Sequence, residues 1–105
     1  MIEYSENFLQ EARTLSKKYR RLKQDLQKAI EEIEIHQDLG IPLGHGLFKK
    51  RMANSSIPTG KSGGFRIIIY RKISQKIVLI SIYSKTHRDS LSDEELRRLL
   101  DAHFH

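Results

Sequence analysis

Hydrophobic residues recur at helical spacing in the first third of the chain. The first series is Phe8, Ala12, Leu15 and Tyr19, and the second is Leu22, Leu26, Ala29, Ile30 and Ile33. Residues at such intervals share one face of an α-helix, and charges of both signs fill the remaining positions. The pattern predicts amphipathic helices over residues 6–19 and 21–36, joined near Arg20 as an antiparallel hairpin.

The period changes to two after residues 39–44, where Gly and Pro end the second helix. Residues 47–52 alternate, which places Lys49 and Arg51 on the face opposite Lys50. The β-branched and aromatic runs at 65–71 and 77–83 predict two more strands. The last run is nearly all apolar, so we expect it to be a central strand. Residues 2–4 could add an edge strand.

A capping box, Ser92 with Glu95, opens a final helix that continues to Phe104. The order of elements is (β)ααβββα over 105 residues, which is the length of one domain. We therefore expect residues 1–105 to form a small α+β domain. Its twisted antiparallel sheet would pack against an N-terminal helical hairpin and a C-terminal helix, with the helices on one face.

The charge is distributed unevenly along the chain. The net charge is +6, and residues 39–88 contain ten Lys and Arg but no Asp or Glu. Ordinary surfaces interleave both signs, because concentrated like charges repel one another. The imbalance favours a polyanionic partner, most often nucleic acid. Chance imbalance in a basic protein is the alternative.

Several classes of protein are disfavoured by what the sequence lacks. The chain has no cysteine, so disulfides and thiolate metal sites are excluded, and a reducing cytosol is favoured. No segment resembles a signal peptide or a membrane span. The four histidines other than His87 show no metal-ligand spacing supported by carboxylates. We expect a cytoplasmic protein that contacts no membrane and needs neither metal nor cofactor.

Residues 60–62 read Gly-Lys-Ser, as in a nucleotide-binding P-loop. That motif needs a glycine at position 55, where this chain has Ser55, and a helix directly after the loop. A strand is expected after Gly64 instead. The sequence therefore argues against an ATP site.

Several stretches together resemble the RelE/ParE/HigB superfamily of bacterial toxins from type II toxin–antitoxin modules. They are FLQEARTLSKKYRRLKQDL, GHGLFKKRMA, GKSGGFRIIIY, IVLISIYSK and LSDEELRRLL. The resemblance implies a twisted sheet flanked by helices and a RelE-like activity: cleavage of mRNA in the ribosomal A site without a metal. It also implies an antitoxin that covers the basic face with acidic residues or displaces the C-terminal helix.

Metal-free RNA cleavage needs a base for the 2′-hydroxyl, an acid for the leaving oxygen and cations for the phosphorane. The resemblance matches Lys49 and Arg51 to a catalytic lysine pair, Arg66 to a phosphate-binding arginine and Lys85 to a second catalytic arginine. Lys49 is the better base, because guanidinium rarely deprotonates. His87 is the candidate acid, since it titrates near neutrality.

Three further residues are candidates for RNA binding: Lys61, Tyr83 and Arg88. Tyr83 could stack on a base or serve as a second acid, and Lys61 could touch phosphate. Each candidate also has a plain structural explanation, such as a solvated face, core packing or, for Arg66, a helix carboxylate. Two other functions stay open: inhibition of DNA gyrase, as by ParE, and nucleic-acid binding without catalysis.

Overall fold

The computed structural model describes residues 2–57, 64–88 and 90–104, and these ranges contain five strands and three helices. The elements in chain order are β1 (Ile2–Tyr4), α1 (Glu6–Lys18), α2 (Leu22–His36), β2 (Ile41–Gly44), β3 (Leu47–Met52), β4 (Phe65–Arg71), β5 (Ile77–Ser84) and α3 (Asp93–Phe104). The α+β class is confirmed, and every predicted helix and strand is present.

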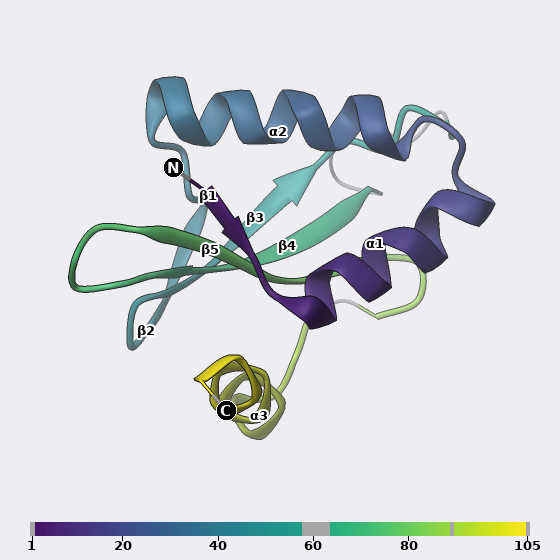
Figure 1. Cartoon of the computed structure of the whole chain (residues 1–105). Helices are drawn as coiled ribbons and strands as arrows, with labels where there is room; N and C mark the ends of the chain where they lie inside the picture. The colour runs from purple at the N-terminus through teal and green to yellow at the C-terminus, as the bar shows by residue number, and fades with distance from the viewer. Residues whose placement is uncertain (1, 58–63, 89, 105) are drawn as a thin grey trace.

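The strands form one sheet in the order β1-β5-β4-β3-β2 (Figure 1). Neighbours in β2 to β5 run antiparallel, but β1 pairs parallel with β5, beginning at Ile2 opposite Ile77. The expected antiparallel sheet is therefore a mixed one. β5 lies between β1 and β4, which confirms that it is an interior strand. Side-chain alternation does not give strand direction, so the expectation of an all-antiparallel sheet was wrong.

β2 was not expected, because its sequence, Ile41-Pro42-Leu43-Gly44, looked only like the end of a helix. Proline is tolerated on an edge strand, where its missing N–H leaves no ladder bond unmade. Gly40 leads into β2 with φ of 86°, and a Cβ there would lie 2.3 Å from the carbonyl oxygen of Lys49. The glycine therefore lets the chain before β2 pass close to the backbone of β3, and it does not merely end α2.

Helices cover both faces of the sheet, not one as expected (Figure 1). The core beneath α1 and α2 includes Phe8, Ile33 and Ile67, whereas α3 packs through Leu96 onto Ile68 on the opposite face. β4 and β5 are apolar at successive positions, and strands of that kind need cover on both sides. The C-terminal helix supplies the second cover.

Hydrogen bonds at the helix starts explain where two of the helices begin. The Ser5 Oγ accepts a hydrogen bond from the Phe8 amide at 3.0 Å. At α3 the Glu95 amide donates to the Ser92 Oγ, and the Ser92 amide donates back to the Glu95 carboxylate at 3.0 Å. The predicted capping box is confirmed, and it satisfies two backbone N–H groups at the start of α3.

Lys50 anchors β3 from the side of α2. Its side chain is 2% exposed, and its Nζ lies 3.0 Å from carboxylate oxygens of both Glu32 and Asp38. Because successive side chains in a strand point to opposite faces, this anchor leaves Lys49 and Arg51 on the face of α3. The predicted alternation in β3 is confirmed.

Candidate functional site

Three candidate side chains stand in one row across β3, β4 and β5. Arg51 lies directly opposite Arg66, and Arg66 lies directly opposite Tyr83. Directly paired residues share a face, with Cβ atoms about 5 Å apart. Lys49 stands two residues before Arg51 on the same face of β3. We call Lys49, Arg51 and Arg66 the cationic cluster.

The members of the cationic cluster differ in exposure. Arg51 is exposed, and Lys49 is half-buried, with its Nζ 3.3 Å from the Ser90 Oγ. Arg66 is 2% exposed, and its Nη1 donates to the Phe65 carbonyl at 3.2 Å. A phosphate could therefore meet Arg51 directly, whereas it would reach Arg66 only after neighbouring side chains moved aside.

Gly64 brings three strand ends together beside the cluster. A Cβ at Gly64 would lie 2.1 Å from the carbonyl oxygen of Met52, so no other residue fits against the end of β3. The Gly64 carbonyl accepts a hydrogen bond from the Lys85 amide at 2.9 Å, just beyond β5. The glycine therefore holds the start of β4 against the ends of β3 and β5.

Lys85 and His87 occupy the turn that follows β5, and both are exposed. The His87 amide donates to the Ser84 carbonyl at 3.0 Å, which closes the turn. His87 lines a groove against α1 together with Tyr83, so it lies at the edge of the sheet beside the row. In the described part of the chain, no hydrogen bond or ion pair joins Lys85 or His87 to a side chain of the cationic cluster.

Arg88 and Lys61 are the remaining two RNA-binding candidates. The Arg88 Nη2 donates to the Glu95 carboxylate at 2.7 Å, so this guanidinium has a partner within the chain. It joins the turn after β5 to the first turn of α3. Lys61 lies outside the described residues.

The charge imbalance is partly compensated inside the fold. Lys50, Lys72 and Arg88 all pair with carboxylates from outside residues 39–88. Among the described residues, five cations of this span have no carboxylate partner: Lys49, Arg51, Arg71, Lys76 and Lys85. In the described part of this span, fewer cations are therefore unpaired than the sequence indicated. Two of the unpaired ones, Lys49 and Arg51, belong to the cationic cluster.

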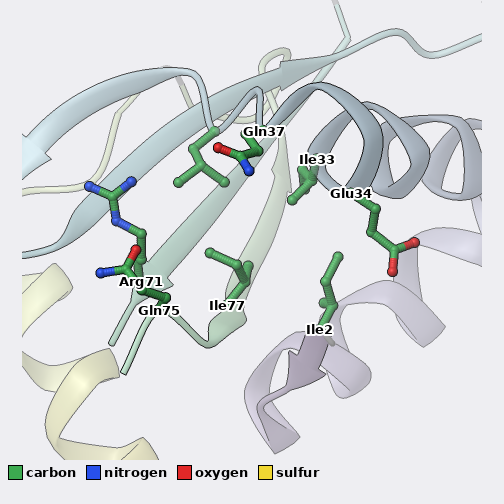
Figure 2. Close-up of a pocket in the computed structure, with 8 residues that line it drawn as sticks. Ile2, Ile33, Glu34, Gln37, Arg71, Gln75 and Ile77 are labelled. Atoms are coloured by element: carbon green, nitrogen blue, oxygen red, sulfur yellow. The ribbon is translucent and has the colours of Figure 1, made fainter. Parts of the chain in front are cut away.

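A second hollow lies between the end of α2, β1 and the β4–β5 hairpin (Figure 2). Ile2, Ile33 and Ile77 line its inside, and Arg71 and Gln75 stand at its rim. None of the candidate site residues belongs to it. The Arg71 guanidinium lies 5.0 Å from the centre of the Phe48 ring, which accounts for its position.

No pattern in the sequence indicated that α1 forms one wall of this region. Gln10, Thr14 and Leu15 line the groove that His87 shares, and helical spacing alone marked only Leu15 as apolar. Within the described ranges, no group of three or more His, Asp or Glu side chains could hold a metal ion. None of the helices seen there is long and apolar enough to cross a membrane.

Comparison with protein families matches residues 8–103 to the RelE toxin of the RelE/RelB toxin–antitoxin system. The chain therefore belongs to the RelE toxin family, and membership implies an antitoxin partner. A search of curated proteins finds no match.

Two solved structures share the fold. A double arginine mutant of the E. coli RelE toxin in the free state has a TM-score of 0.59 and 15% identity, covering 97% of this chain and 95% of that one. The isolated E. coli RelE toxin has a TM-score of 0.54 and 16% identity, covering 97% of both chains. At such identity the likeness concerns the fold alone.

Proposed function

We propose that this toxin is an endoribonuclease that cuts mRNA in the ribosomal A site and so inhibits translation in the cytoplasm. The observation that carries the proposal is the row of Arg51, Arg66 and Tyr83 across three strands, with Lys49 beside it. Cations fixed on a sheet are preorganised to stabilise the charge that builds on a phosphorane.

The reaction would use the RNA's own 2′-hydroxyl as nucleophile. Lys49 in its neutral form removes the 2′ proton, and the 2′-oxygen attacks the adjacent phosphorus. Arg51, Arg66 and Lys85 offset the phosphorane charge. The bond from phosphorus to the 5′-oxygen then breaks, and His87 gives that oxygen its proton. The products are a 2′,3′-cyclic phosphate and a free 5′-hydroxyl.

The antitoxin would silence the toxin at the face of α3. Lys49 lies beside the segment that leads into α3, and Leu96 holds this helix on the sheet. An acidic antitoxin segment could cover Lys49 and Arg51, or an apolar one could replace α3 on the sheet. The RelE family assignment supports an antitoxin, and the geometry of the complex is part of the proposal.

The test is to induce the chain without an antitoxin and to map mRNA 5′ ends by primer extension. We expect new ends inside translated codons and an arrest of translation. Intact transcripts with normal translation would overturn the nuclease. Intact transcripts with stalled DNA replication would indicate gyrase inhibition instead.

A further inference from the structure

A groove of about 350 Å³ separates α1 from the end of β5. Gln10, Thr14 and Leu15 form its wall on α1, and Ile82, Tyr83 and His87 close it from the other side. Sites for small ligands have volumes of roughly 300–1,000 Å³, so the groove has room for one nucleobase. Single-stranded RNA is recognised through such unstacked bases.

The groove combines an apolar bed with unused polar groups. The half-buried Leu15 offers apolar surface to the face of a base, and the buried Ile82 completes the apolar lining. The Gln10 amide and the His87 imidazole make no side-chain hydrogen bond within the described part of the chain, and both can donate and accept. The Thr14 hydroxyl donates to the Gln10 carbonyl at 3.1 Å and keeps its lone pairs. The groove can thus both stack on the face of a base and hydrogen-bond to the edge of that base.

The Glu11 carboxylate keeps the groove open at its base. Its Oε1 accepts hydrogen bonds from the Ser81 hydroxyl at 2.7 Å and from the Ile82 amide at 3.2 Å. These bonds hold α1 at a fixed distance from β5, beyond the point where the short β1 ends. The groove is therefore built into the fold rather than left between mobile side chains.

The groove meets the row at Tyr83, which stands directly opposite Arg66 and also lines the groove. We propose that the groove binds the base of the nucleotide on the 3′ side of the cut. This inference rests on the proposed function, in which His87 protonates the 5′-oxygen of that same nucleotide. A base held in the groove brings its 5′-oxygen to the imidazole.

The experiment compares two synthetic mRNAs on ribosomes with an empty A site, one intact and one abasic at the 3′ nucleotide. For the wild-type chain we expect cleavage of the abasic RNA to be about tenfold slower, as loss of one stacked base implies. Thr14→Phe fills the groove, and Gln10→Ala removes its free amide; both positions are exposed. In Thr14→Phe the two RNAs should be cut at similar rates, and in Gln10→Ala the difference should shrink.

Ser16→Phe is the matched control, since Ser16 is exposed on the same helix and does not line the groove. It should keep the wild-type ratio between the two RNAs. Equal cleavage of both RNAs by the wild type would overturn the inference and leave the nuclease standing. So would a Thr14→Phe chain that keeps the wild-type ratio but loses antitoxin binding, because the groove would then serve a protein. No cleavage of either RNA would instead refute the proposed function.

Discussion

Lys50 is the residue whose position most directly orients the cationic cluster. Its buried ammonium binds Glu32 and Asp38, and those carboxylates are 27% and 53% exposed. If Lys50 is removed, the two carboxylates stay partly hydrated, because both are partly exposed. If the two carboxylates are neutralised, the buried Lys50 ammonium loses its counter-charges. Leaving the buried member of an ion pair without its counter-charge is the costlier change.

We therefore predict that Glu32→Gln with Asp38→Asn destabilises the fold by about 3 kcal/mol, and that Lys50→Met costs less than about 2 kcal/mol. Urea unfolding followed by circular dichroism measures both. Glu31→Gln with Glu34→Gln is the control, because it removes two carboxylates of the same helix without touching Lys50. Equal costs for the first two variants would contradict this account of the anchor.

At the scale of residues, the sequence predicted which side of β3 each side chain takes, since alternation follows from strand geometry alone. It did not predict the burial of Arg66, which depends on the elements that pack over β4. It also could not pair Lys50 with Asp38 or Arg88 with Glu95. Such pairs join separate elements, and their formation depends on tertiary packing. The catalytic roles of Lys49 and His87 stay predictions.

At the scale of elements, α3 is held by its capping box and by Arg88. The Glu95 carboxylate accepts hydrogen bonds from the Ser92 amide and from Arg88. These bonds, the Ser92 amide having the larger effect, lower the pKa of Glu95 below its ordinary value of 4.5. A carboxyl group with a lowered folded-state pKa adds stability above its unfolded pKa. That stability is lost as the pH falls through the folded-state value.

Amide hydrogen exchange of α3 should accordingly become faster, relative to β4, as the pH falls below about 4.5. Exchange must be corrected for its intrinsic dependence on pH. In Glu95→Gln, α3 should be less protected at neutral pH and should lack this pH response. Glu94→Gln, one residue earlier and exposed, should behave as the wild type. A pH response that persists in Glu95→Gln would show that another group holds α3.

The order of elements was predictable because each long element carries its own period and its own start signal. The arrangement of the sheet was not, because β1 meets β5 across most of the chain. The strand β2 was missed for a local reason, since Gly40 and Pro42 are typical of both helix ends and edge strands. The apolar residues on both faces of β4 explain why α3 packs on the face opposite α1 and α2.

At the scale of the whole molecule, the account requires no metal ion, because cations of the chain supply the charge. EDTA at a concentration below that of Mg²⁺ removes transition metals, which it binds far more tightly, and leaves ribosomes intact. Cleavage of ribosome-bound mRNA should keep its rate after this treatment. A loss that Zn²⁺ or Mn²⁺ restores would contradict the mechanism.

Net positive charge alone could also attract the chain to ribosomes. An experiment must therefore distinguish the effect of the cationic cluster from the effect of net charge. Arg51 and Lys76 are both exposed and lie at different places on the sheet, in β3 and in the β4–β5 hairpin. Reversing either one changes the net charge equally. Only Arg51 belongs to the cationic cluster.

The most direct measurement is therefore the cleavage rate of mRNA on purified ribosomes for Arg51→Glu and Lys76→Glu. The account predicts that Arg51→Glu lowers the rate by about a hundredfold or more, as loss of one preorganised charge does in other sites. Lys76→Glu should stay within about threefold of the wild type, since screening by salt weakens distant charges. Equal rates for the two variants would contradict the claim that the cationic cluster performs the chemistry.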